Sequence, residues 1–516
     1  MDAPVAALIT ALSTFSDVAQ AAGIVVAALL AAVALLARSP RARALGMLGA
    51  LALTPVLLVA NIWSTEQFEP LRDHPTLALG AAAAGLVVLA FGALAFRRRP
   101  ALLVLAAAVA LPFRVPIESG GDTANLLVPL YLVIAAGGLA YAAARLRAYG
   151  WREDPEPERG PGRLEWLLAA SIVLYALQAA YSADFDRALS QTIFFYVPFA
   201  LLFALLVRIE WTKRLALQCL GVLVALAVVF VGIGFVEYAK RELLLNPKVI
   251  SSNQFETYFR VNSLFFDPNI YGRFLATVML GLSAVLLWSR RTNVVAGCAI
   301  ALALLMAGLV LTLSQSSFTA LLAGLAILGG LRWGWRRAGI VLAGFALVAL
   351  VVVLAAPGAV GLDQSLDNAS SGRSDLIRGG VELAADRPLA GWGAGAFRRE
   401  YRDHEKASSE RATAASHTIA ITVAAEQGIV GLALYLALLA VALSLLLRGA
   451  RESAARAAVA AAFVALVVHT LMYAAFLEDP LAWALLAVGA ALAGQAALAG
   501  RPAKPPGEGA EPAAEP

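Results

Sequence analysis

The chain has 516 residues, of which 60% are hydrophobic and 15% are charged, and its formal net charge is +5 at pH 7. Soluble domains have about 45–50% apolar residues, so this composition excludes an ordinary soluble domain. The small net charge does not indicate nucleic-acid binding, and the sequence has no P-loop, dinucleotide-binding glycine fingerprint, thiolate cluster or His-pair metal motif.

Apolar runs of about 17–23 residues, long enough to cross a bilayer as helices, recur along the whole chain. They lack the period-two alternation of outer-membrane barrel strands, so the predicted fold class is all-α: a polytopic transmembrane helical bundle of about 12–15 spans. The run 101–113 is short enough to be re-entrant. In chain order the predicted spans are residues 21–36, 44–62, 77–96, 101–113, 126–144, 164–181, 191–207, 215–238, 269–288, 293–313, 318–331, 338–356, 429–447, 457–476 and 481–498.

Arginines are concentrated in every second connection between these runs. By the positive-inside rule, this alternation predicts an extracytoplasmic N-terminus and a cytoplasmic C-terminus. It also places loop 239–268 and the polar turn at Ser314 on the extracytoplasmic side. The predicted divisions are N-terminal helices 1–110, core helices 111–356, an extracytoplasmic loop domain 357–415, C-terminal helices 416–500 and a disordered cytoplasmic tail 501–516.

Three polar stretches fall on the predicted extracytoplasmic face. In the first, Arg260 precedes Asp267-Pro268-Asn269, where an N-cap residue and a helix-initiating proline predict the start of a helix. Arg273 lies one turn into this span. An arginine at that depth either faces a partner in a wet cavity or extends its side chain to the interface.

The second stretch contains Arg373 and Arg378 at the start of a predicted helix, which suits an anion site or, alternatively, a solvated face. The Gly-rich turn 391–397 after it suits either a ligand approach or a tight connection. The third stretch contains His417 and Glu426, too far apart for one helix face. His417 is a candidate proton acceptor or a structural histidine, whereas His404 is expected to be solvated and His469 to be a satisfied core residue.

Together these residues resemble the O-antigen ligase/polymerase-like family of bacterial membrane glycosyltransferases. The resemblance extends over roughly residues 111–431. It is carried by Arg260 with Phe266-Asp267-Pro268-Asn269, the Leu-Thr-Leu-Ser turn 311–314, Gly372-Arg373-Ser374, the segment 388–397, His417, and the segment 426–431.

The resemblance implies a multi-pass protein of the bacterial cytoplasmic (inner) membrane that takes an undecaprenyl-diphosphate-linked glycan as donor. The acceptor would be a glycan, lipid or protein hydroxyl, and no metal or other cofactor is implied. His417 would act on the acceptor hydroxyl, with inversion at the anomeric carbon. Arg260 and Arg373, with Arg378 and Arg273 in support, would bind the diphosphate; Asn269, Ser314, Gln315 and Glu426 would support the site.

Two positions depart from the family pattern. Many members have Ser-Arg where this chain has Ser314-Gln315, and His-Asn where it has His417-Thr418. One phosphate-binding arginine is therefore missing or supplied elsewhere in the chain. Two other functions are compatible with the sequence: a transporter or flippase of a lipid-linked or anionic substrate, and an assembly protein whose insert binds partners.

Overall fold

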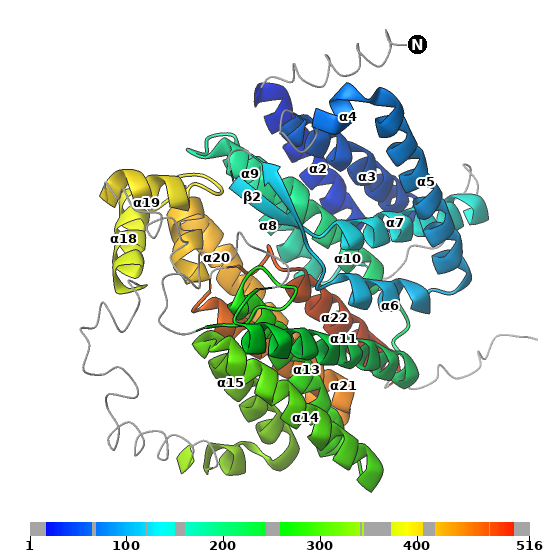
Figure 1. The fold of residues 1–516 in the computed structure, drawn as a ribbon. Coiled ribbons are helices and arrows are strands. Elements are labelled where there is room, and N and C mark those ends of the chain that lie inside the picture. Colours follow the sequence, from blue (N-terminus) through cyan, green and yellow to red (C-terminus); the bar gives the residue numbers. More distant parts are fainter. Residues whose placement is uncertain are drawn as a thin grey trace, which may run out of the picture.

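A computed structural model describes residues 17–63, 69–119, 122–149, 160–243, 259–340, 343–344, 373–405, 418–473 and 475–499. These residues form a bundle of helices with one small β-hairpin (Figure 1). The first half of the chain contains α2 Asp17–Leu36, α3 Pro40–Ile62, α4 Glu69–Asp73, α5 Pro75–Arg98, α6 Ala101–Ala110, β1 Val115–Ser119, β2 Asp122–Leu126, α7 Val128–Tyr149, α8 Arg163–Ala179, α9 Phe185–Gln191, the π-helical turn η2 Thr192–Tyr196, α10 Val197–Leu206 and α11 Lys213–Lys240.

The second half contains α13 Pro268–Trp288, α14 Thr292–Thr312, α15 Gln315–Trp333, α18 Arg373–Asp386, α19 Phe397–Glu405, α20 Ile419–Leu447, the 3-10 turn η6 Ala450–Glu452, α21 Ala454–Thr470 and α22 Pro480–Ala499. Most of the predicted span 338–356 lies outside the described residues.

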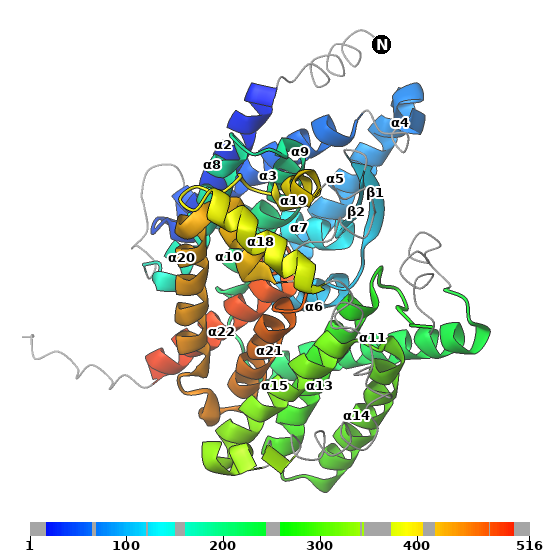
Figure 2. The ribbon, with the colours of Figure 1, turned by 90° about the vertical axis from the view of Figure 1, so that its left-hand side faces the viewer.

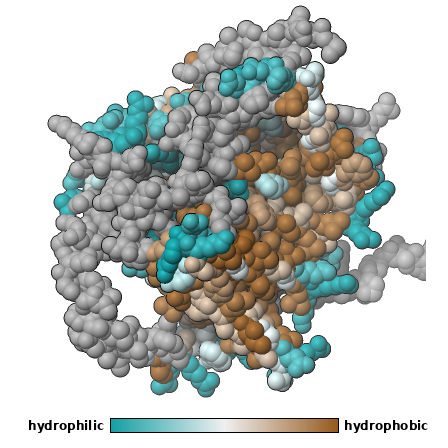
Figure 3. Space-filling view, in the orientation of Figure 1, coloured by the Kyte–Doolittle hydropathy of each residue, from teal (hydrophilic) through white to brown (hydrophobic). Residues whose placement is uncertain are grey.

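The predicted polytopic helical bundle is confirmed. Among the described residues, 11 helices are long and apolar enough to cross a membrane, and α6 and α21 are shorter apolar helices. Apolar side chains cover a broad part of the surface in Figure 3, and polar side chains gather toward its margins. Such a surface suits lipid, because the bilayer core offers no partners to exposed polar groups.

Two spans begin well before their predicted starts, at Phe185 and at Ile419. The span predicted at 191–207 starts at Phe185 and continues through η2 and α10, and 89% of its most apolar window is buried inside the bundle. The polar residues Asp186 and Arg187 concealed this first part, which Asp184 caps by accepting a hydrogen bond from the Arg187 amide. The span predicted at 429–447 starts at Ile419 and is broken at Gly428, which has φ 65° and ψ −165°.

The hairpin of β1 and β2 departs from a purely helical prediction. Its two antiparallel strands pair Val115 with Leu126 and Ser119 with Asp122. The sequence carried a signal for it, since Gly120-Gly121 stands between the strands. Helix α6, before the hairpin, has 10 residues, about 15 Å of helix, which is half the thickness of the hydrocarbon core.

The helices form two groups (Figures 1 and 2). In one group α2 packs against α3 and α8, and α7 against α3 and α5; in the other, α13 packs against α14, α15 and α21. Helices α20 and α22 join the groups through contacts with α8 and α10. Side-chain hydrogen bonds link α8 and α9 to α20 and to the connection after α21, and they link the connection after α11 to the end of α14. Two more join α15 to α21 and the start of α20 to the connection after α21.

Candidate functional site

The site begins with the first turn of α13. Asp267 caps this turn by accepting a hydrogen bond from the Asn269 amide at 2.6 Å, and Pro268 occupies the first helical position. The turn presents the Asn269 side-chain oxygen to two donors. These are Nη2 of Arg260 at 3.1 Å and the Ser314 hydroxyl at 2.8 Å. Arg260 also donates from Nε to the Thr312 carbonyl at 2.9 Å. Three of the residues predicted to form the site therefore contact one another.

The turn between α14 and α15 completes this cluster. Leu313 takes the left-handed conformation, with φ 49°, and Ser314 caps α15. Ser316 in the first turn of α15 lies 3.2 Å from Nε2 of His469, a fully buried residue of α21. His469 is a core residue, as predicted, and its Nε2 has a hydrogen-bond partner in Ser316. Its Nδ1 has no hydrogen-bond partner among the described residues. Gln315, at the position where family members have arginine, is exposed.

Arg273 faces a buried partner. Its Nη2 lies 2.6 Å from Oδ2 of Asp479, and the two side chains are only 5% and 4% exposed. The guanidinium also lies 5.9 Å from the ring centroid of Tyr473, whose hydroxyl donates to Asp267 at 3.4 Å. Of the two interpretations of Arg273, the side chain extended to the interface is therefore wrong, and the buried partner is Asp479.

The loop domain 357–415 is called the insert below. Its glycine-rich turn holds the described part of the insert against the bundle. The amides of Trp392 and Gly393 donate to the carbonyls of Ala425 and Glu426 at 3.0 and 2.9 Å, and the amide of Ile429 donates to Pro388 at 2.8 Å. A Cβ atom added to Gly393, which has φ 98°, would lie 2.3 Å from Cα of Ser182. The turn is thus a tight connection, because its close backbone approaches are occupied by the protein itself.

Glu426 takes part in this docking. Its side chain is buried, and Oε1 accepts a hydrogen bond from the Phe397 amide at 3.2 Å. The side chain of Gln178 on α8 donates to the carbonyls of Ala390 and Gln427, each at 3.3 Å. Glu426 therefore connects the insert to α20. In the sequence it is far from the Arg260 cluster, which consists of Arg260, Asn269 and Ser314.

Two further predicted site residues, Arg373 and Arg378, belong to the insert. Arg373 begins α18, and Arg378 is exposed one turn further along this helix. His404 is exposed on α19, as predicted. His417 lies outside the described residues. The next residue, Thr418, donates its hydroxyl to the Leu471 carbonyl at 3.0 Å, so the chain directly after His417 contacts the connection between α21 and α22.

A second buried polar cluster was not predicted from the sequence. Glu478, next to Asp479, accepts a hydrogen bond from the Gln191 amide group at 2.6 Å, and the Tyr175 hydroxyl donates to the same Gln191. Burial raises the pKa of Glu478, while Arg187 and the Gln191 hydrogen bond oppose this shift. The sequence signal was the acidic pair Glu478-Asp479 at the end of an apolar run, where charged residues are costly.

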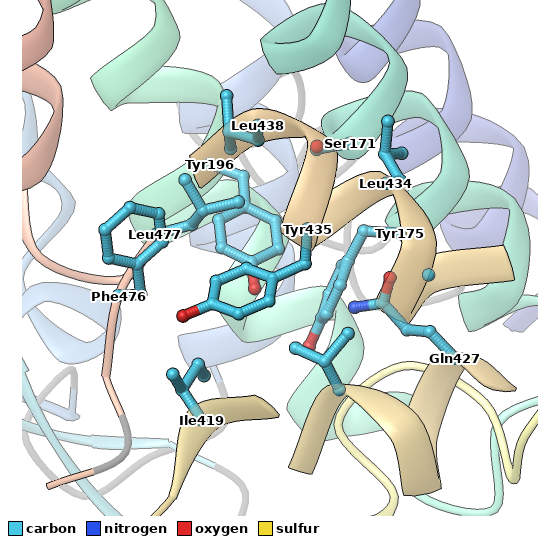
Figure 4. Close-up of a pocket in the computed structure, with 12 residues that line it drawn as sticks. Ser171, Tyr175, Tyr196, Ile419, Gln427, Leu434, Tyr435, Leu438, Phe476 and Leu477 are labelled. Carbon is cyan, nitrogen blue, oxygen red and sulfur yellow. The ribbon is translucent and has the colours of Figure 1, made fainter. Parts of the chain in front are cut away.

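A pocket opens beside this second cluster, between α8, η2, α20 and the residues before Glu478 (Figure 4). The rings of Tyr175, Tyr196 and Tyr435 gather at its centre, with Phe476 and Leu477 to one side. Apolar and aromatic walls with a few polar groups are typical of ligand pockets. Its lining residues are Ser171, Tyr175, Tyr196, Ile419, Val423, Gln427, Gly431, Leu434, Tyr435, Leu438, Phe476 and Leu477.

No group of three or more His, Cys, Asp or Glu side chains is placed to hold a metal ion in the described part of the chain. The buried polar clusters described above contain guanidinium groups, hydroxyls and carboxylates. Guanidinium groups bind phosphate oxygens through paired N–H donors.

Comparison with known proteins gives a family match over part of the chain. The family model described as O-antigen ligase matches residues 299–436, from α14 through α15 and the insert to the first half of α20. No curated protein matches the chain. The matched region contains Ser314, Arg373, Arg378, His417 and Glu426, while Arg260, Asn269 and Arg273 lie before it. The resemblance to the O-antigen ligase family that was inferred from the sequence is confirmed over residues 299–436, and the many apolar helices make the chain a multi-pass membrane protein.

Proposed function

We propose that the protein is a glycosyltransferase of the bacterial cytoplasmic membrane. It transfers an oligosaccharide from undecaprenyl diphosphate to an acceptor hydroxyl, as an O-antigen ligase or a polysaccharide polymerase does. The N-terminus and the site lie on the extracytoplasmic side, and the C-terminus lies in the cytoplasm. The insert 357–415 is an extracytoplasmic domain.

One observation carries this proposal. Arg260 is anchored at the end of the helical bundle by Thr312 and Asn269, and Asn269 is in turn held by Ser314, which lies in the region that matches O-antigen ligases. A fixed guanidinium at the membrane surface suits the head group of a polyprenyl-linked donor, because the prenyl tail keeps the diphosphate at that depth.

The transfer is a single displacement. The acceptor oxygen forms a bond to the anomeric carbon as the bond from this carbon to the diphosphate oxygen breaks, so the configuration inverts. His417 takes the proton of the acceptor hydroxyl. Arg260 and Arg373, with Arg273 and Arg378 in support, balance the charge that develops on the departing diphosphate. The reaction needs no metal and no other cofactor.

The test is transfer in vitro by the full-length protein in lipid nanodiscs, with an undecaprenyl-diphosphate oligosaccharide donor, EDTA and a choice of acceptors. We expect transfer by the wild type and a loss of at least about 100-fold in Arg260→Gln, because removing one oxyanion-stabilising donor costs that much in other enzymes. Arg332→Gln is the matched control, since Arg332 is exposed at the far end of α15.

Full transfer by Arg260→Gln would contradict the proposed role of Arg260. The productive acceptor separates ligase from polymerase. Translocation of the donor without its consumption would identify a transporter instead.

A further inference from the structure

Arg114 lies next to the Arg260 cluster although it is far from it in sequence. It follows α6 and precedes β1, and its guanidinium carbon lies 5.2 Å from the ring centroid of Phe266, directly before the Asp267 cap. The charges of Asp479 and Arg273 act on it, as does the hydroxyl of Tyr473. The contact with Phe266 and these charges place Arg114 beside the ion pair of Arg273 and Asp479.

Around these residues the guanidinium groups of Arg114 and Arg273 outnumber the carboxylates that balance their charge. Asp479 is the carboxylate that acts on both Arg114 and Arg273, and its oxygen Oδ2 lies against Arg273. Asp267 is already engaged, because it caps Asn269 and accepts from Tyr473. Burial lowers the pKa of Arg114, with Asp479 opposing the shift, but the group is still a cation at neutral pH.

Two donors of these arginines have no acceptor in the part of the chain that the structure describes. Nε of Arg114 and Nη1 of Arg273 are buried and make no hydrogen bond within the described residues. A buried N–H without an acceptor costs about 1–3 kcal/mol, and more when the group is charged. A buried cation without a full counter-charge is also costly. Both costs disappear when an anion with several acceptor oxygens binds to these donors.

We propose that Arg114 and Arg273 form a guanidinium pair that binds the second phosphoryl group of the donor diphosphate, beside the group bound by Arg260. The inference rests on the proposed function. Asn269, which holds Arg260, and Arg273 are four residues apart on α13, so their side chains are neighbours about 5–6 Å apart on one face. A single diphosphate spans such a distance. Asp479 neutralises Arg273 while the site is empty.

The test measures binding without catalysis. Geranyl diphosphate and geranyl monophosphate are titrated into the full-length protein in nanodiscs by isothermal calorimetry. The variants are Arg114→Gln, Arg114→Lys and Arg260→Gln, with Arg332→Gln as the control. We expect Arg114→Gln to weaken diphosphate binding about 10–100-fold, the range for a lost hydrogen bond to a charged group. It should weaken monophosphate binding much less, because the single phosphoryl group is bound by Arg260, which this variant retains.

The two proposals fail in different ways. If Arg260→Gln loses diphosphate binding while Arg114→Gln binds like the wild type, the role of Arg114 is wrong and the proposed function stands. If wild type and all variants bind neither probe, the diphosphate site itself is wrong. Size-exclusion chromatography identifies a misfolded Arg114→Gln. In that case Arg114→Lys decides: an intermediate loss supports the proposal, because lysine keeps the charge without the fork, and unchanged binding contradicts it.

Discussion

A substitution at Gly428 tests whether close backbone contacts at glycines position the insert. Gly428 has φ 65° and ψ −165°, a region that essentially only glycine occupies, and a Cβ atom added there would lie 2.3 Å from the Leu389 carbonyl oxygen. That oxygen belongs to backbone, so it cannot move aside as the end of a flexible side chain can. The backbone conformation alone costs a non-glycine residue about 1–3 kcal/mol.

We therefore expect Gly428→Ala to destabilise the docked insert by at least about 2 kcal/mol. The change is local, because the amides of Trp392, Gly393 and Ile429 make the hydrogen bonds across this contact. Hydrogen–deuterium exchange of the peptides around residues 388–397 and 425–431 measures it. A loss of about 2 kcal/mol corresponds to roughly 30-fold faster exchange, since 1.4 kcal/mol is a factor of ten.

Gly85→Ala is the matched control. It makes the same chemical change in the interior of α5, where an added Cβ has no heavy atom within 4 Å. Alanine is favoured over glycine in a helix by about 0.5–1 kcal/mol, so the exchange of 388–397 should not change. Wild-type exchange rates in Gly428→Ala would refute the reasoning. Because α18 carries Arg373 and Arg378, a detached insert should also slow transfer more than it weakens diphosphate binding at Arg260.

Two further predictions concern the connection between α21 and α22. Asp479→Asn should lower the free energy of unfolding by about 3–5 kcal/mol, because Arg273 is left buried without its charged partner, and the double variant Arg273→Met, Asp479→Leu should recover most of this loss. Unfolding in mixed micelles titrated with SDS measures both variants. A loss below about 1 kcal/mol in Asp479→Asn, as for a surface ion pair, would contradict the prediction. Burial raises the pKa of Glu478 above its ordinary value of 4.5, so its contribution to stability is fully present below that value and is lost as the pH rises through the raised pKa. Glu478→Gln should flatten this part of the profile of SDS midpoint against pH, and an unchanged profile would assign the pH dependence to another group.

The helical bundle was predictable because a bilayer imposes its length and polarity on each span separately. Hydropathy alone therefore located α13 and α14 to within a few residues. The hydropathy-based prediction failed where a span buried among other helices contains polar residues. Asp186 and Arg187 made the start of α9 look like a loop, although this span lies at the centre of the bundle.

The site was predictable in part. The cap at Asp267 and the serine turn at Ser314 carry local sequence signals, and the structure joins them through Asn269. Contacts such as Gln191 with Glu478 connect residues that no local pattern relates, because they depend on how the two groups of helices pack. The exposed side chain of Gln315 shows the same limit: its turn was expected, but its orientation is decided by the packing of α15.

The adjacent carboxylates Glu478 and Asp479 have different partners. Glu478 contacts Gln191 of α9, while Asp479 contacts Arg273 of α13, so two neighbouring residues tie together the two halves of the molecule. Inserting or deleting one residue before this pair would shift both carboxylates by one position, and the two contacts could not both form. During evolution the length of this short segment is therefore under stricter constraint than the identity of its apolar residues. Homologues should vary in sequence between Tyr473 and Leu477 while keeping the same number of residues.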